Sequence, residues 1–266
     1  MIRATVRGAV LPCHGAEKKK MAAHDEGGGD RFPTTHVSAV LGVKSDDDSE
    51  RTRSLETVTA AYWKPVYKYL RMRWRLPPEE AEDVTQDFFA RALDKSTFAT
   101  YDPMRGRFRT FVRTCLERFV IDRMRVQRAK KRGGGAIRTP LDFADAENEL
   151  AGLTPPSPDA LDSWFESEFV RHIMALAVVE LGKECERKGK MQHYRIFERY
   201  HLADAHEPPA YATVAEEFGI TTVDVTNRLN WVRREFRRLV LETLRGITGN
   251  DEDFKSEARA VFGVEG

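Results

Sequence analysis

The feature that most restricts the fold of this chain is the spacing of its apolar residues, which is helical wherever a pattern is found. One helical face between residues 107 and 131 consists of Phe108, Val112, Cys115 and Phe119. These residues recur at intervals of four, three and four, as on one side of an α-helix, and no strand-like alternation competes with this pattern. The sequence therefore predicts an all-α fold, with Arg109 and Arg113 excluded from the core face.

The same periodicity predicts the other helices. The main segments expected are 50–75, 78–95, 107–131, about 164–201, 208–218 and 221–245, after a short helix capped by Thr34 or Thr35. Pro65 is expected to kink or break the first of them, since proline removes a backbone hydrogen bond. Gly182 and Gly189 are expected to interrupt the fourth.

Charge is strongly segregated along the chain, although the formal net charge is only +1. Residues 102–132 hold eleven lysines and arginines against three acids, whereas residues 142–170 hold eight acids and no base. Residues 228–238 are basic again, with five arginines against Glu235. Segregation of charge into such blocks is typical of a protein with a local basic surface that binds polyanions.

Composition shifts divide the chain into two small helical modules. Residues 1–30 lack apolar periodicity and are expected to be disordered. The stretch RGGG at 132–135 ends the last helix of the first module, 31–134. Prolines and acids at 135–163 predict a flexible linker, followed by a second module at 164–246 and a tail at 247–266.

The stretch PAYATVAEEFGITTVDVTNRLNWVRREFRRL, residues 209–239, has the pattern of a helix-turn-helix. Small Ala215 lets two helices approach, Gly219 permits a left-handed turn, and Val225 and Leu229 pack back. In the DNA-binding interpretation the second helix enters a major groove. Its candidate contact residues are Thr222, Asp224, Thr226, Asn227, Arg228, Arg233 and Arg234. The alternative is a plain helical hairpin with a basic solvent face.

Two further segments, EEAEDVTQDFFARAL and YDPMRGRFRTFVRTCLERFVIDRMRVQRAKKRGGG, together resemble the second conserved region of bacterial RNA polymerase sigma factors of the extracytoplasmic-function type. The helix-turn-helix resembles their fourth conserved region. The two resemblances cover roughly residues 31–245. The long acidic linker indicates a divergent branch of that family.

The resemblance implies that the helix at 78–95 docks on the clamp helices of the largest polymerase subunit. Its outward polar residues are Glu80, Asp83, Gln86 and Asp87, which suit a basic partner surface. Two other interpretations of these acids are a merely solvated face and, with no neighbouring histidine in support, a metal or acid–base site.

The resemblance also implies that residues 101–131 melt the minus-ten promoter element and hold its non-template strand. Capture of a single strand needs cations along the phosphates and flat groups that stack on exposed bases. The candidates are Tyr101, Arg105, Arg107, Arg109, Arg113, Arg123 and Arg125. Phe108, Phe111 and Phe119 fit the core better.

Three interpretations of the acidic segment at 142–170 stay open. It is a solvent-exposed linker, or a segment that the resemblance would thread through polymerase, or an internal mimic of nucleic acid that covers the basic faces of the free protein.

The sequence thus favours a sigma factor, a non-catalytic protein without cofactor or metal that binds core polymerase and promoter DNA. An anti-sigma factor or other regulatory protein is a further conceivable partner. The odd, dispersed cysteines and the lack of a long apolar run predict a cytoplasmic protein outside the membrane. The alternatives are a helix-turn-helix regulator that acts without polymerase and, third, a DNA-processing enzyme such as a recombinase.

Overall fold

The structure is a computed structural model that describes residues 38–94, 97–129, 141–203 and 207–263. Within these ranges every regular element is helical, which confirms the all-α expectation. Three expectations lie outside the described residues: the disorder of residues 1–30, the capping by Thr34 or Thr35, and the helix end at RGGG, 132–135.

The first lobe is built around α2 (Asp48–Arg73), which packs against α1 (Ala39–Gly42) and α3 (Pro78–Asp94). The Asp47 carboxylate caps α2 by accepting hydrogen bonds from two backbone amides of its first turn. Pro65 lies buried inside α2, so the expected break at this residue is wrong. Its neighbours Tyr62 and Val66 are also buried, and this packing outweighs the loss of one backbone hydrogen bond.

The basic helix α4 (Phe108–Ala129) completes this lobe after two short turns, η1 (Thr97–Thr100) and η2 (Pro103–Arg105). Its innermost face consists of Phe108, Val112, Leu116 and Val120. These residues are four apart, so the core face differs from the predicted one. Cys115 and Phe119 lie at its edge and are only partly buried.

The expectation of a flexible linker at 135–163 is wrong for its described part, 141–163. This part contains α5 (Phe143–Leu150) and the short turn η3 (Pro158–Ala160), and α5 packs on α2. Phe143, Ala146 and Leu150 form a buried stripe at helical spacing, and the Asp142 side chain caps the helix. Prolines and acids around this stripe concealed it in the sequence.

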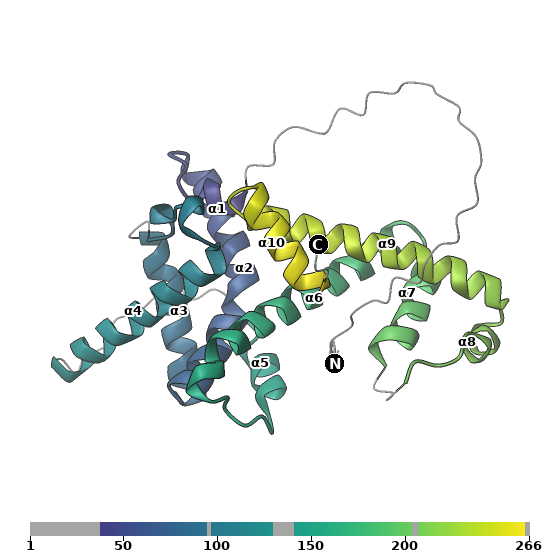
Figure 1. Cartoon of the computed structure of the whole chain (residues 1–266), viewed down its shortest axis with the longest axis horizontal. Coiled ribbons are helices and arrows are strands. Elements are labelled where there is room, and N and C mark those ends of the chain that lie inside the picture. The colour runs from purple at the N-terminus through teal and green to yellow at the C-terminus, as the bar shows by residue number, and fades with distance from the viewer. Residues whose placement is uncertain (1–37, 95–96, 130–140, 204–206, 264–266) are drawn as a thin grey trace.

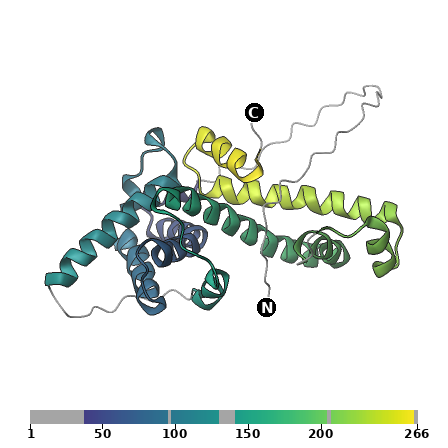
Figure 2. The same cartoon turned by 60° about the horizontal axis from the view of Figure 1, so that its bottom comes forward.

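Two long helices, α6 (Leu161–Arg187) and α9 (Thr222–Gly246), lie side by side and connect the two lobes (Figures 1 and 2). The helix α6 packs on α2 at one end and on α9 at the other, so it crosses the predicted boundary between modules at 163/164. It passes through Gly182 unbroken and ends before Gly189, whose φ of 65° requires a left-handed conformation.

The second lobe contains α7 (Met191–Phe197), the π-helical turn η4 (Glu198–Leu202) and α8 (Tyr211–Phe218), with α7 and α8 packed against α9. The tail forms a further helix, α10 (Asp251–Phe262), which is capped by Asn250 and turns back onto α9 (Figure 1). None of the described helices is both long enough and apolar enough to cross a lipid bilayer.

Candidate nucleic-acid interface

The predicted helix-turn-helix forms from α8 and α9. Gly219 ends α8 in the left-handed region, with φ 63° and ψ 39°, and Ile220 follows it, partly buried against the core. Thr221 and Asp224 then cap α9 reciprocally, each side chain accepting a hydrogen bond from the other residue's backbone amide. Val225 and Leu229 are fully buried, as predicted.

The predicted DNA contacts on α9 are unequally available. Thr222, Asn227 and Arg234 are exposed, whereas Thr226 is half-buried and its hydroxyl donates to the backbone carbonyl of Thr222. The Asp224 carboxylate belongs to the helix cap, and hydrogen bonds from Thr221 hold its pKa below the ordinary value. Capping therefore accounts for an acid that is otherwise unsuited to a DNA surface.

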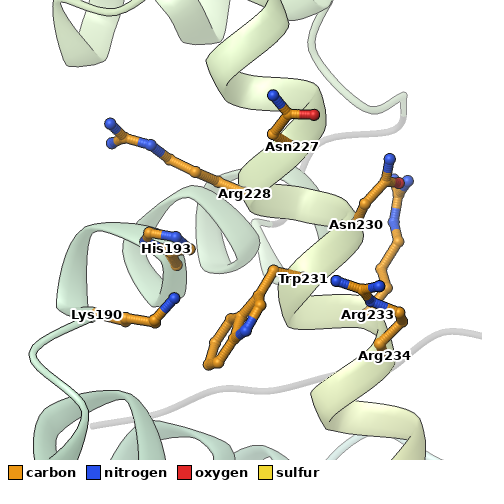
Figure 3. Close-up of a pocket in the computed structure, with 8 residues that line it drawn as sticks. All are labelled: Lys190, His193, Asn227, Arg228, Asn230, Trp231, Arg233 and Arg234. Carbon is orange, nitrogen blue, oxygen red and sulfur yellow. The ribbon is translucent and has the colours of Figure 1, made fainter. Parts of the chain in front are cut away.

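An open groove of about 730 Å³ lies between α7 and α9 (Figure 3). Its lining residues are Lys190, His193, Asn227, Arg228, Asn230, Trp231, Arg233 and Arg234. Four of them are cations and none is an acid. In Figure 3 the Arg228 side chain extends over His193, and the Lys190 ammonium lies 4.3 Å from the centre of the Trp231 ring. Cations bind phosphates and an aromatic ring can stack on a base, so this groove is suited to binding nucleic acid.

Hydrogen bonds to α7 and η4 hold two of these arginines. Arg228 donates to the side-chain oxygen of Gln192, and Arg233 donates from Nε to Nε2 of His201 at 3.2 Å. Burial, followed by the Arg233 charge, lowers the pKa of His201 to about 4, so its ring is neutral and accepts this bond at neutral pH.

The predicted site lacked four of the groove residues: Lys190, His193, Asn230 and Trp231. A signal for Trp231 was present in the sequence, since Asn227, Trp231 and Arg234 lie on one helical face. No local signal marked Lys190 or His193, because they reach the groove from α7 through tertiary packing.

The predicted single-strand residues fall into two groups. The side chains of Arg105 and Arg125 are 86% and 77% exposed, and each has only a surface ion pair with an acid three residues away. Met104, which the sequence analysis did not select, is 88% exposed beside Arg105. These three residues are directly accessible to a ligand.

The other group is engaged inside the protein. Arg109 is 1% exposed, 3.1 Å from Glu257 on α10 and 3.0 Å from Glu166 on α6, so the expectation that it lies on the outer face of α4 is wrong. Tyr101 is 2% exposed, with its ring against Phe108, and in this conformation it cannot stack on a base. Arg109 is covered by α6 and α10, whereas Tyr101 is covered by the start of α4 and by the tail at Gly249 and Asp253.

Arg107, Arg113 and Arg123 are half-buried and also have partners. Arg107 donates to the Ser256 hydroxyl, Arg113 pairs with Asp162, and Arg123 pairs with Asp87. The last contact engages one of the predicted polymerase-docking acids within the first lobe. On the same helix Asp83 is exposed, while Glu80 and Gln86 are half-buried.

Acids of the 142–170 segment cover a basic face of α2. Lys64 contacts Asp145 and Glu149, Lys68 contacts Glu149 and Glu168, and Arg71 contacts Glu147. Burial alone would raise the pKa of Glu149, but hydrogen bonds from Lys64 and Lys68 outweigh it and lower that pKa. Four acids of the negative segment are therefore held against cations of α2.

Residues 60–130, from the middle of α2 through α4, match the family model for sigma-70 region 2. No curated protein and no solved structure matches the chain. The matched stretch contains the arginine-rich helix and the acidic face of α3 described above. The match supports a sigma-70 family sigma factor, with a role in transcription initiation by RNA polymerase.

Proposed function

We propose that this protein is a sigma factor of the extracytoplasmic-function type, from a branch distinguished by its acidic segment at 142–170. It acts in the cytoplasm as a non-catalytic subunit of RNA polymerase. The first lobe docks on the clamp helices and holds the melted minus-ten strand, and the helix-turn-helix contacts the upstream promoter element. A regulatory protein such as an anti-sigma factor is a further partner to be sought by co-purification.

One observation carries this proposal: the matched segment at 60–130 occurs in the same chain as a helix-turn-helix with a cationic groove. A regulator that only binds duplex DNA needs the groove but not the first lobe. The groove has four cations and no acid, as expected for phosphate contacts. The exposed Arg105 and Arg125 supply the first contacts of the first lobe with a single strand.

Transcription in vitro with purified core polymerase tests the proposal. Core polymerase with this protein should produce transcripts from defined start sites, which core polymerase alone does not produce. Tight binding to duplex DNA without any such transcripts would instead support the alternative, a helix-turn-helix regulator that acts alone.

Docking through α3 is tested at Asp83, the exposed acid of the predicted surface. Asp83→Arg should abolish co-purification with core polymerase, because it places a cation where the partner surface is expected to be basic. The matched control is Glu56→Arg, an exposed site on α2 with the same change of charge. Equal co-purification of both variants would contradict the docking assignment.

Phosphate binding in the groove is tested by the salt dependence of duplex binding. Arg228→Ala and Arg234→Ala should each reduce the slope of log affinity against log salt by about 0.9 for each phosphate that the arginine neutralises in the wild type. Arg53→Ala, an exposed arginine on α2 in the first lobe, should leave the slope unchanged. Unchanged slopes for the two groove variants would remove these residues from the interface.

A further inference from the structure

The C-terminal helix α10 lies against the part of the first lobe that contains the predicted single-strand residues. Figures 1 and 2 show it folded back along α9, next to that lobe. The Asn250 amide donates to the Pro103 carbonyl at 3.4 Å, and Arg107 donates to the Ser256 hydroxyl. The Tyr101 hydroxyl lies 3.4 Å from the Asp253 carboxylate. Both ends of the loop between η1 and α4 therefore contact the tail.

Close packing at Gly249 brings the tail onto this loop. A Cβ atom added at Gly249 would lie 2.8 Å from Cγ of Pro103 and 2.9 Å from a ring carbon of Tyr101. Real Cβ atoms do not approach neighbours so closely, so any larger residue would push the two segments apart. By contrast, a Cβ atom added at Gly246, three residues earlier, would meet no heavy atom within 4 Å.

The innermost stripe of α10 is largely acidic. Its buried residues are Asp253, Glu257 and Val261, spaced four apart, and only the valine is apolar. An ordinary packed helix directs apolar residues inward. Here two carboxylates face Tyr101 and the arginines Arg107 and Arg109. Arginine binds carboxylates and phosphates alike, so these acids occupy cations that could otherwise bind a strand.

The contact between α10 and the arginines of the first lobe leaves several buried polar atoms without hydrogen-bond partners. No nitrogen of Arg109 makes a well-aligned hydrogen bond, although two carboxylates lie within 3.1 Å, and one oxygen each of Asp253 and Glu257 is buried without a partner. Buried polar groups without partners destabilise a fold. Such a contact is suited to being replaced by a ligand.

We propose that α10 is an intramolecular lid that occupies the single-strand surface of the first lobe in the free protein and leaves it when the strand binds. This inference rests on the proposed function, because it assigns the covered surface to a melted promoter strand. The apparent affinity of a covered surface for its ligand is the intrinsic affinity multiplied by the fraction of molecules in which the lid is open. The lid therefore restrains binding of nucleic acid until polymerase presents the strand.

The ionisation of Glu257 is consistent with such a lid. Burial raises its pKa to about 7, because the opposing charge of Arg109 is not sufficient and the neighbouring Asp253 adds to the shift. The other charged groups that face it are Arg107, next to α4, and Glu166 on α6. A carboxylate that loses its solvation on docking weakens the closed state.

Two neutral variants test the lid in the full chain. Gly249→Ala should push α10 off the loop, and Gly246→Ala is the matched control. Release is measured by trypsin cleavage after Lys255 and Arg259, which are exposed on α10. Binding is measured with a fluorescent single-stranded oligonucleotide. Gly249→Ala should increase both the cleavage rate and the affinity for the oligonucleotide about tenfold, and Gly246→Ala should resemble the wild type.

A second pair of variants keeps the test valid if Gly249→Ala misfolds. Glu257→Lys places a cation beside Arg109 and should release α10, whereas Glu252→Lys makes the same change of charge at an exposed position of the same helix. The lid is supported if Glu257→Lys binds the oligonucleotide more tightly than Glu252→Lys. Because each new lysine is itself a trypsin site, release of α10 in these two variants is measured by hydrogen exchange of the α10 amides. The lid is overturned if α10 is released without any gain in affinity, or if neither Gly249→Ala nor Glu257→Lys releases it.

The failure of the lid and the failure of the proposed function give different results. If wild-type protein directs specific transcripts with core polymerase while released variants gain no affinity, the lid is wrong and the sigma-factor role stands. If released variants gain affinity but no specific transcripts form, the lid stands as a cover of a strand-binding surface and the sigma-factor role is wrong.

Discussion

Glutamine at position 257 should make docking of α10 less sensitive to pH. In the folded protein burial raises the pKa of Glu257 to about 7, against an ordinary value of 4.5. The docked state therefore binds a proton more readily than the undocked state, so docking weakens as pH rises from about 4.5 and this loss is complete above about 7. Glutamine keeps the size of the neutral acid and removes the titration.

The magnitude follows from the difference between the two pKa values. A difference of about 2.5 corresponds to about 3 kcal/mol between docked and undocked states at high pH. Relative to the wild type, protection of α10 amides in Glu257→Gln should therefore increase from a few-fold at about pH 5 to about 300-fold at about pH 8. Arg109 and Glu166, which face position 257, are the same in both proteins.

Hydrogen exchange of the α10 amides, measured for both proteins at each pH, gives this ratio directly, since intrinsic exchange rates cancel. Glu252→Gln, an exposed site on the same helix, should show no such trend. A ratio that stays constant with pH, or that falls as pH rises, would refute the reasoning, because it would mean that Glu257 is already ionised when α10 is docked.

Other predictions concern stability and are measured by equilibrium urea unfolding. Glu168→Gln should destabilise the protein by about 3 kcal/mol, because it removes the negative charge that is paired with buried Lys68. The control, Glu180→Gln at an exposed position, should have little effect. Equal effects of the two substitutions would contradict the importance of the buried pair. Gly219→Ala should cost about 1–2 kcal/mol through its left-handed backbone alone, since a Cβ atom there meets no neighbour. Thr221→Ala should cost about 1 kcal/mol by removing the cap of α9, and an unchanged stability would argue against that capping box.

Local patterns in the sequence were sufficient where neighbouring residues decide the conformation. The helix-turn-helix is the clearest case, because a glycine that adopts φ 63°, a capping threonine and buried Val225 and Leu229 all lie within eleven residues. The chain's helical character was predictable for the same reason. A periodicity of 3.6 residues depends only on which residues are apolar.

The sequence was least informative where one helix meets another. Arg109 flanks the apolar stripe of α4, so on an isolated helix it would be exposed. It is buried because α6 and α10 form a second layer over that flank. Whether such a layer exists depends on residues more than fifty positions away, which no local periodicity records.

The charged segments also show which features follow from the sequence alone and which depend on the tertiary structure. The sequence alone determined that a cationic segment and an anionic segment exist, and that such blocks leave the whole chain with a net charge of only +1. Only the tertiary structure decided that acids of the anionic segment and of α10 meet arginines and lysines of the first lobe. Charge pairing acts through space over a few ångströms, and the packing of α2 on α6 and of α6 on α9 is part of what brings these distant residues within that range.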